Sequence, residues 1–536
     1  MFYPKSEVLL NKYSEYEEYI VNIDSYLYSL DPQERSQMNI DVIADVTGIP
    51  IGVVEFLFKK YCEEGLMKEE NILFCPIEES PIKEIENNHD SIFEDFCDIC
   101  AENHKFTNKD IKTRYSIIEF PKGKTTVQQS DIGLTSHEHL DSEDIEKISN
   151  QMRLLNLYCN ELESKPFEGK RFIIVLHFLK DLIPFMCCCE KLGLNPKETI
   201  LFYKEYLYPH KEPIIEFFKE KGYIVSSILF LDDILKSFQD QCENNEKPII
   251  IIEDGGYIVP KVHENEFSLL NKQTLGAVEQ TTKGQRRDEE VEKLNFPVIN
   301  VAGSILKNTY EPPHIARTVV RNIQNLLVDT NFSSQKALVI GYGSIGKSIV
   351  ESLKSTLKMI VTVHDKDPDK LVHATNETDV QVEPYSKGAV KNKFLIIGAT
   401  GEASIGLDEL TSMEHNVYLI SASSDQVEIG LKNLESLKIA KKPIDNKKEI
   451  GTEYTLRGTK KIINLVADGY PINFWANESM PNEASDLIMT LIFLSTIEIA
   501  NNHQSMPKKI NSEIVNEIAK ANKVSERYLS IYNLIG

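Results

Sequence analysis

The chain has 536 residues, which is too long for a single hydrophobic core, and we expect about three domains. Its 41% hydrophobic and 26% charged residues are typical of a soluble globular protein, and no apolar run approaches the roughly 18 residues of a membrane span. The N-terminus lacks the basic start and apolar core of a signal peptide, so we expect a cytoplasmic protein. The nine cysteines include an adjacent trio at 187–189 within an apolar segment, which favours reduced core residues over a disulfide framework.

The first fifth of the chain carries most of the negative charge. The net charge is −23, and residues 1–100 contain 7 Lys or Arg against 22 Asp or Glu, which gives −15. Residues 40–75 predict a helix, a turn, a second helix and a strand, an order typical of a winged helix. Nucleic-acid binding needs a positive face, because phosphate contacts supply most of the affinity. We therefore interpret residues 1–120 as an acidic winged-helix-like module that contacts a protein partner, with nucleic acid disfavoured.

Four residues near the end of this module have side chains that zinc prefers. Cys75, Cys97, Cys100 and His104 follow the spacing C-x21-C-x2-C-x3-H, with the ligand types and number that a closed tetrahedral zinc site requires. In a competing interpretation, Cys97 and Cys100 lie with aromatic neighbours on the apolar face of a helix, where small buried cysteines are ordinary core residues. The sequence leaves both interpretations open.

A polar, turn-rich stretch at 121–146 predicts a linker. Strands and helices alternate over residues 171–260, which predicts an α/β domain, expected to extend over 147–310.

The segment Ala337–Lys347, ALVIGYGSIGK, is the most informative in the chain. An apolar strand leads directly into the spacing of a dinucleotide-binding turn, with Gly341, Gly343 and Gly346. The first glycine permits the tight turn, the second lets the backbone approach a pyrophosphate, and the third lets the following helix pack closely on the strand. The helix that starts around Ser344 and Ile345 would then hold the phosphates at its N-terminus.

Other strand ends complete the predicted dinucleotide site. The apolar run at 359–363 ends near Asp365, whose carboxylate can accept both hydroxyls of the adenosine ribose, and this favours NAD over NADP. Ligands of open α/β sheets lie beyond the carboxyl ends of the strands, so Thr400, Gly401 and Asn473 are candidates for contacting the dinucleotide. The alternative for each of these three is turn chemistry.

Ten ordered segments between residues 165 and 520 resemble the S-adenosylhomocysteine hydrolase (adenosylhomocysteinase) family. They are LHFLKDLIPFMCCCEKLGL, IIIIEDGG, GAVEQTTKG, VINVAGSILKNTYE, GYGSIGK, HDKDP, GATG, QVEI, ADGYPINFWANESMP and SMPKKINSEIVNEIA. The resemblance implies an α/β fold in which a Rossmann NAD-binding domain at 311–478 is inserted into a split substrate-type domain that resumes at 479–536. It also implies a tightly bound NAD, a nucleoside-like ligand and a homo-oligomer, either a dimer or a tetramer.

In this family, NAD oxidises the substrate's 3′-hydroxyl to a ketone, which acidifies the neighbouring C4′ proton and allows homocysteine to be eliminated. Water then adds and the ketone is reduced. By similarity, His177 is the substrate-domain histidine, Asp254 is the acid/base aspartate and Lys307 is the lysine that serves the hydroxyl oxidation. Glu311 stands where the family has an aspartate. Thr281 and Thr282 match residues that lie beside the cofactor.

Several family residues are replaced in this chain. Gln280 stands where a glutamate holds the ribose hydroxyls, and an amide cannot supply the same charged acceptor. Ser423 or Ser424 stands where a histidine lies near the attacking water, and Met480 stands where another histidine helps to hold adenine. Pro312 replaces an asparagine and so removes a side-chain amide and a backbone donor.

These retained and replaced residues leave three hypotheses. In the first, the protein binds NAD, its hydrolase chemistry is lost or redirected, and it acts as a nucleotide-sensing or scaffold component. In the second, it is an active hydrolase of S-adenosylhomocysteine or a related nucleoside, because His177, Asp254 and Lys307 persist together. In the third, it is a ligand-responsive transcription regulator, which would need a basic surface that the first 100 residues do not provide.

Overall fold

The computed structural model forms two compact units, residues 1–124 and 125–536, and each unit is considered by itself. The described residues are 3–13, 16–30, 35, 38–76, 81–85, 93–97, 102–107, 110–118, 140, 142–204, 211–242, 246–377, 379–414, 416–423, 426–447, 450–457, 461–475 and 478–534. None of the helices in these ranges combines the length and the apolar composition that a membrane span requires.

The first unit combines a helical core with a small antiparallel sheet. Its helices are α1 (Pro4–Lys12), α2 (Glu17–Ser29), α3 (Ile40–Thr47) and α4 (Ile51–Glu63), and its sheet has the order β2 (Pro81–Ile85), β1 (Met67–Phe74), β5 (Ile111–Ile117). Asn39 caps α3 by accepting a hydrogen bond from the N–H of Asp41, and Gly48 ends that helix with a φ of 69°, which glycine adopts easily. The two helices and the strand predicted over residues 40–75 are present, whereas the winged-helix assignment stays a prediction.

A two-stranded hairpin also belongs to the first unit. It is formed by β3 (Phe93–Cys97) and β4 (Glu102–Phe106), which pair antiparallel. The alternative prediction of a helix that carries Cys97 is therefore wrong. The segment that ends in Cys97 is too short to be a stable helix by itself, and its backbone pairing with β4 determines its conformation. Cys100 lies outside the described residues.

The second unit begins with a seven-stranded sheet in which every neighbouring pair is parallel. Its spatial order is β20 (Ile510–Asn511), β11 (Val298–Asn300), β10 (Thr274–Glu279), β9 (Ile249–Glu253), β6 (Arg171–Val175), β7 (Thr199–Tyr203) and β8 (Ile224–Ser227). The central strands β6 and β9 are buried along their whole length, which explains their nearly continuous apolar sequences. The last strand, β20, comes from the C-terminal segment and pairs with β11.

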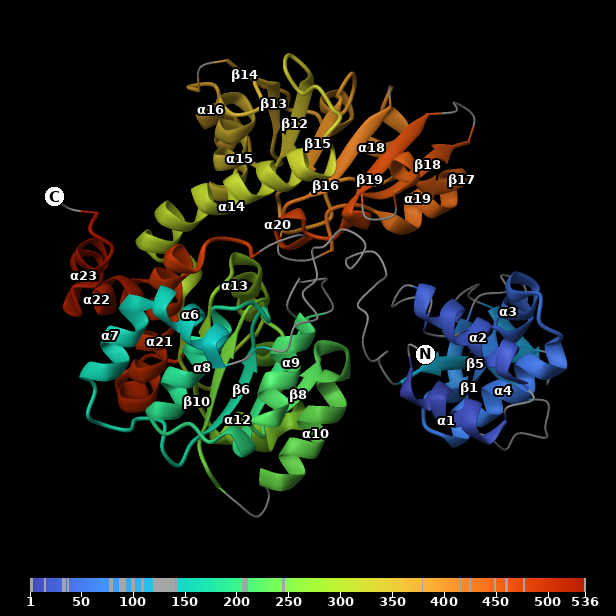
Figure 1. Cartoon of the computed structure of the whole chain (residues 1–536), viewed down its shortest axis with the longest axis horizontal. Helices are drawn as coiled ribbons and strands as arrows, with labels where there is room; N and C mark the ends of the chain where they lie inside the picture. Colours follow the sequence, from blue (N-terminus) through green and yellow to red (C-terminus); the bar gives the residue numbers. More distant parts are fainter. Residues whose placement is uncertain are drawn as a thin grey trace. The chain divides into compact units, whose positions relative to one another are not determined.

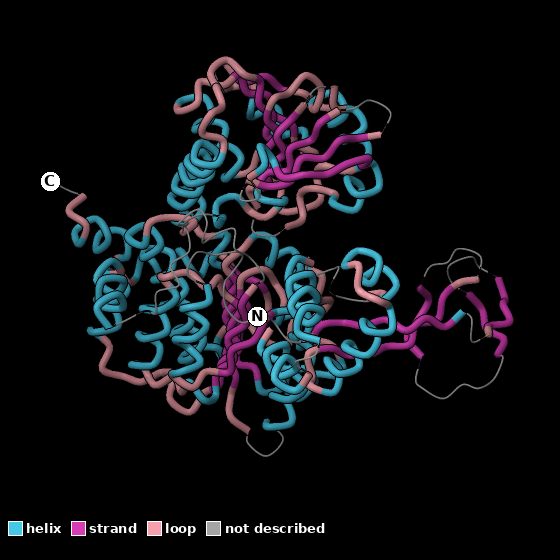
Figure 2. Tube along the Cα trace, turned by 45° about the vertical axis from the view of Figure 1, so that its right-hand side comes forward, coloured by secondary structure: helices cyan, strands magenta, loops and turns pink. Residues whose placement is uncertain are grey.

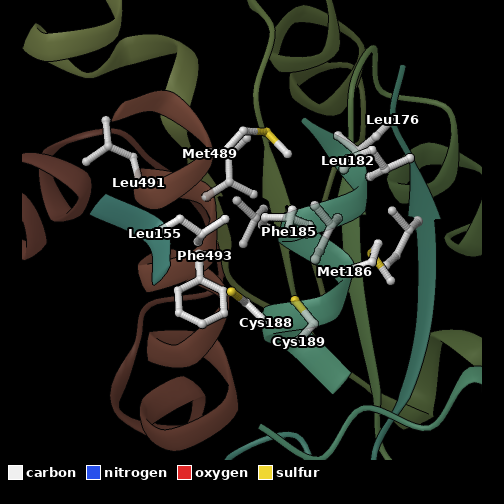
Figure 3. Packing of buried hydrophobic residues seen from close by; sticks show 14 of the residues in the cluster. Leu155, Leu176, Leu182, Phe185, Met186, Cys188, Cys189, Met489, Leu491 and Phe493 are labelled. Atoms are coloured by element: carbon white, nitrogen blue, oxygen red, sulfur yellow. The ribbon is translucent and has the colours of Figure 1, made fainter. Parts of the chain in front are cut away.

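Helices cover both faces of this sheet (Figure 1). They are α6 (Ser142–Gln151), α7 (Arg153–Glu161), α8 (Leu182–Lys191), α9 (Lys211–Glu220), α10 (Leu231–Cys242), α11 (Ile258–Val262), α12 (Ser268–Gln273), α13 (Thr282–Glu289), α21 (Asn482–Asn502), α22 (Glu513–Ala521) and α23 (Val524–Ile531). On one face, Cys188 and Cys189 of α8 lie in the core with Phe493 of α21 (Figure 3). Both cysteines are free thiols in a buried apolar cluster, as expected from the sequence.

A second sheet follows in the same unit, and Figure 2 shows the strands of both sheets with helices beside them. Its order is β14 (Val380–Val382), β13 (Ile360–His364), β12 (Lys336–Ile340), β15 (Leu395–Gly398), β16 (Val417–Ser421), β19 (Ile462–Val466), β18 (Gly451–Leu456) and β17 (Lys438–Pro443). The first six strands are parallel, and the chain reverses its direction of winding between β12 and β15. This is the predicted Rossmann arrangement, and ligands bind at such a reversal.

One long helix connects the two sheets. α14 (Ile305–Leu326) starts after β11 and packs against α15 (Ser344–Ser355), α20 (Ile472–Trp475) and α21, so that it joins the two halves of the unit (Figure 1). The remaining helices of the Rossmann half are α16 (Pro368–Ala374), α17 (Ser386–Ala389), α18 (Leu407–Ser412) and α19 (Leu431–Leu437).

Candidate functional site

A cavity of about 740 Å³ opens at the carboxyl ends of strands from both sheets of the second unit. Its walls contain all but one of the residues that the sequence analysis predicted to be catalytic, substrate-binding or cofactor-binding in this unit. These are His177, Asp254, Gln280, Thr281, Thr282, Lys307, Glu311, Gly341, Gly343, Ser344, Ile345, Asp365, Thr400, Gly401 and Asn473. The exception, Gly346, is buried in the first turn of α15. Segments more than 200 residues apart therefore share one cavity.

The glycine turn after β12 has the shape that its sequence predicts. Gly341 has a φ of 97°, and a Cβ on Gly346 would lie 1.9 Å from the carbonyl oxygen of Gly341, so the close approach of strand and helix requires glycine at both positions. A Cβ on Gly343 would meet nothing within 4 Å, because this backbone faces open space. The N-terminus of α15 follows immediately at Ser344. This cradle fits a pyrophosphate.

Asp365 lies at the end of β13, beside the glycine turn. Its Oδ2 accepts a hydrogen bond from the N–H of Tyr342 at 2.6 Å, and its Oδ1 accepts one from the N–H of Asp367 at 2.9 Å. Each carboxylate oxygen has a second lone pair, so the group can still accept hydrogen bonds from a ligand. The carboxylate thus fixes the turn and remains available to ribose hydroxyls.

Thr400 and Gly401, after β15, are held by Glu428. The N–H groups of both residues donate to Oε1 of Glu428, at 2.6 and 2.7 Å, and the Thr400 hydroxyl donates to Oε2 at 2.9 Å. Their backbone donors are therefore committed to the loop itself, although both residues line the cavity. Glu428 was not predicted as a site residue, but its place in the QVEI segment was a usable signal.

Asn473 offers a more direct sign of a ligand. Its side-chain nitrogen donates to Oγ of Ser479 at 3.2 Å, while its buried Oδ1 has no hydrogen-bond partner among the described residues. A buried polar atom without a partner costs stability, so such an atom in a cavity wall indicates a polar partner that a bound molecule would supply. Together with the glycine cradle and Asp365, this acceptor fits a dinucleotide.

The opposite wall carries His177, two residues after β6. Its ring lies against the ring of Phe474, with centroids 4.4 Å apart, and its Nε2 is 3.5 Å from Oδ2 of Asp254. Burial lowers the pKa of His177 to about 3, and the attraction of Asp254 does not compensate. The imidazole is therefore neutral at physiological pH.

Asp254 directly follows β9, and both of its carboxylate oxygens have side-chain partners that the sequence analysis did not predict. The ammonium of Lys204 lies 2.5 Å from its Oδ1, and the amide of Gln280 donates to its Oδ2. Burial opposes ionisation of this carboxyl, but Lys204, His177 and Gln280 outweigh burial and lower its pKa below the ordinary value.

Sequence reasoning missed Lys204, although a signal existed. This lysine directly follows the buried strand β7, and β7 neighbours β6 in a parallel sheet, so its side chain starts from the same sheet edge as His177.

Lys307 and Glu311 face each other across one turn of α14. Their Nζ and Oε1 atoms lie 2.6 Å apart, and both side chains are largely buried. Pro312, the next residue, is buried within the same helix and lines the cavity. Lys307, which the family resemblance links to hydroxyl oxidation, is thus brought together with Glu311, which stands where the family has an aspartate.

Thr281 caps the N-terminus of α13, which begins at Thr282, and both residues line the cavity. The Thr281 hydroxyl accepts a hydrogen bond from the N–H of Gly284, and it donates to Glu279 at 2.7 Å. Burial, reinforced by Glu253 and Asp254, raises the pKa of Glu279 to about 8. Thr281 is therefore a helix cap whose partner is the buried Glu279.

The replaced family positions also line the cavity. Met480 and Ser423 are both in its wall, whereas Ser424 lies outside the described residues. Glu478, which was not predicted, lies there too, and burial next to Asp181 raises its pKa to about 8. The end of the cavity near Met480 therefore contains acidic groups.

Comparison with known proteins identifies related sequences. Residues 316–478 match the family model described as S-adenosyl-L-homocysteine hydrolase, NAD binding domain. The chain is 28% identical over 380 residues to an adenosylhomocysteinase of Thermotoga maritima, a match that covers 68% of this chain and 88% of the relative. It is 29% identical over 388 residues to one of Pyrococcus abyssi, covering 68% and 85%.

Two further matches are more distant or shorter. An S-inosyl-L-homocysteine hydrolase of Methanopyrus kandleri is 27% identical over 269 residues, which cover 49% of this chain and 61% of that protein. Among solved structures, a dipicolinate synthase chain from Bacillus halodurans matches with a TM-score of 0.38 at 13% identity, covering 62% of this chain and all of the other.

Proposed function

Since the chain is a divergent member of the S-adenosylhomocysteine hydrolase family, we propose that it binds NAD and a nucleoside-like ligand without the family's ordinary hydrolase chemistry. In this proposal the chemistry is lost or redirected, and the protein acts as a nucleotide-sensing or scaffold component. The Rossmann half holds the dinucleotide, and the half that carries His177 holds the nucleoside.

The observation that carries the proposal is that both carboxylate oxygens of Asp254 are bound by other side chains. A general acid or base works best when its pKa lies near the operating pH, because it must both take and release a proton. Here Lys204 and Gln280 occupy the two oxygens of the carboxylate, and its pKa is lowered. A carboxylate held in this way accepts a proton poorly. The ion pair therefore argues against the proton transfer that the family resemblance assigns to this aspartate.

Gln280 weakens the site in a second way. Charged hydrogen bonds contribute about 1.5 to 3 kcal/mol each, so an amide in place of a glutamate costs about one to two powers of ten in holding ribose hydroxyls. The amide is also already bonded to Asp254. Ribose orientation then relies on the remaining polar groups of the cavity.

The dinucleotide would be held by the Gly341–Gly346 turn, the N-terminus of α15, Asp365 and the free oxygen of Asn473. When bound, NAD supplies a hydride acceptor for transient oxidation of a ribose hydroxyl. Phe474 packs against the neutral imidazole of His177 and keeps its ring in a fixed orientation.

An active hydrolase is the second candidate function. It is favoured by the gathering of His177, Asp254, Lys307 and Glu311 in one cavity with the glycine turn. In that reading a ligand would have to draw Lys204 away from Asp254, and freeing the carboxylate would move its pKa toward the operating pH.

One experiment separates the two functions. The purified protein is denatured and the released small molecules are identified by liquid chromatography and mass spectrometry; the native protein is then incubated with S-adenosylhomocysteine. The proposal expects about one NAD per chain and no adenosine production. NAD together with adenosine that disappears in the Asp254→Asn variant would establish the hydrolase, and the absence of any dinucleotide would overturn both functions.

A further inference from the structure

We propose that Cys75, Cys97 and His104 form a zinc site in the first unit, which attaches the β3–β4 hairpin to the end of β1. The two Sγ atoms and a ring nitrogen of His104 all lie within 4.8 Å of one another. This site is separate from the nucleotide cavity, so the proposal stands or falls independently of the proposed function.

Strand pairing brings two of these side chains together. In the hairpin, Cys97 pairs with Glu102, and His104 lies two residues beyond Glu102 on β4. Side chains two residues apart in a strand point to the same face, so Cys97 and His104 are diagonal neighbours on one face of the hairpin. The pairing register therefore fixes this half of the site.

The third side chain comes from the other sheet. Cys75 directly follows β1, the central strand of the β2–β1–β5 sheet, and is buried. It meets Cys97 in a small apolar cluster that also contains Leu73 and Phe106. The three candidate ligands thus come from three separate segments of chain, and a bound ion would connect all three.

The chemistry of the three side chains matches zinc. Thiolate sulfur and imidazole nitrogen are its usual ligands, with Zn–S near 2.3 Å and Zn–N near 2.0–2.1 Å, which places ligand atoms about 3.5–3.8 Å apart in a tetrahedron. Separations of at most 4.8 Å allow this geometry after small side-chain rotations. Hard cations such as Mg²⁺ and Ca²⁺ prefer oxygen ligands and are disfavoured.

The hairpin has a physical reason to need such a link. Each of its strands has five residues, and an isolated two-stranded hairpin is at best marginally stable in water. Its buried apolar cluster with β1 contains just four residues, among the part of the chain that the structure describes. A metal bond between hairpin and sheet adds the stabilisation that so small a core does not provide.

The test is metal analysis of the full chain, purified without chelators from cells supplied with zinc. We expect about one zinc per chain and at least a tenfold loss in the Cys75→Ser, Cys97→Ser and His104→Ala variants. Cys62→Ser is the matched control, because Cys62 lies in the same unit on α4 and outside the cluster, and it should keep its zinc.

A second measurement does not depend on folded variants. Cobalt(II) is exchanged into the unaltered protein, and a thiolate-to-cobalt charge-transfer band is expected because two thiolates coordinate the ion. Less than about a tenth of an equivalent of metal would overturn the proposal. So would a Cys75–Cys97 disulfide in the metal-free protein, or zinc that all three variants retain.

Discussion

Lys204 and Asp254 form a buried ion pair, with 2.5 Å between Nζ and Oδ1, and Asp254 lines the cavity. They directly follow β7 and β9, the two strands that flank β6, and His177 follows β6 between them. Both charged side chains are almost fully buried, at 2% and 3% exposure. The ammonium of Lys204 therefore lies directly against Asp254, the residue to which the family resemblance assigns proton transfer.

Replacing Lys204 should destabilise the protein, because the buried carboxylate of Asp254 then has no cation beside it. We expect Lys204→Met to lower the free energy of unfolding by about 3 to 5 kcal/mol at pH 8, because it leaves a buried charge without its partner. Without the ammonium, burial raises the folded-state pKa of Asp254 above its unfolded value, so the variant loses stability as pH rises. Denaturant unfolding at pH 5 and pH 8 measures both effects.

Lys236→Met is the control for this substitution. Lys236 pairs with Glu266 at 3.0 Å, but both side chains are about half exposed, at 49% and 51%, and solvent screens such a pair so that it contributes little to stability. Equal losses for the two variants, or a loss for Lys204→Met that does not grow with pH, would contradict the role of the buried pair.

Substitutions at two glycines of the turn can distinguish a loss of cofactor binding from a loss of folding stability. A Cβ on Gly343 meets nothing within 4 Å and projects into the space where phosphates are expected, so Gly343→Val should keep the fold and lower the NAD content at least tenfold. A Cβ on Gly346 would lie 1.9 Å from the carbonyl oxygen of Gly341, so Gly346→Ala should lower the unfolding temperature as well.

NAD content is measured by mass spectrometry of the denatured protein, and folding by thermal unfolding. Gly52→Ala, at an open position in the exposed first turn of α4, is the control and should change neither. If Gly343→Val retained stoichiometric NAD, the dinucleotide would have to bind elsewhere.

His177 should make the protein sensitive to acid. Its folded-state pKa is lowered to about 3 from an ordinary value near 6.5, so its stabilising contribution is complete above pH 6.5 and decreases as pH falls toward 3. Between pH 6.5 and 5 this amounts to about 2 kcal/mol. We expect His177→Gln to lose less stability than the unaltered protein over that interval in denaturant unfolding. The exposed His373→Gln serves as control, and equal pH dependence in all three proteins would rule out a buried neutral imidazole.

Local sequence patterns sufficed for the Rossmann half. The Gly341–Gly346 turn, the strand before it and Asp365 lie within about thirty residues, and each part is specified by steric demands that a short segment carries. The contents of the cavity could be predicted in outline for the same reason, since parallel strands bring their carboxyl ends to one edge.

Interactions between distant segments were not predictable in the same way. The Lys204–Asp254 pair joins positions fifty residues apart, and only the order β7–β6–β9 brings them together. The segment that ends in Cys97 is too short for its apolar pattern to distinguish helix from strand, and pairing with β4 decided it. Burial raises the pKa values of Glu279 and Glu478. The burial of a side chain depends on the folded chain around it and cannot be read from the sequence directly.

Asp288 should be a source of instability that a single substitution removes. It is fully buried on α13, its two oxygens have no hydrogen-bond partner among the described residues, and burial near Glu253 and Glu279 raises its pKa to about 10. A group with a raised folded-state pKa stabilises fully below its unfolded value near 3.9, and this stability is lost as pH rises toward 10. We expect Asp288→Asn to be close to neutral at pH 4 and to stabilise the protein by about 1 to 3 kcal/mol at pH 8.

Unfolding free energies at pH 4, 6 and 8 test this prediction, with Glu289→Gln as the matched control, because Glu289 is the exposed neighbour on the same helix. The control makes the same change from carboxyl to amide at an exposed position, so its effect should stay within about 0.5 kcal/mol at every pH. A gain for Asp288→Asn that increases with pH would identify a buried carboxyl that is protonated in the native state. A loss that increases with pH would mean that Asp288 is ionised and held by a cation, because the amide would then remove an attraction that strengthens as the carboxyl ionises.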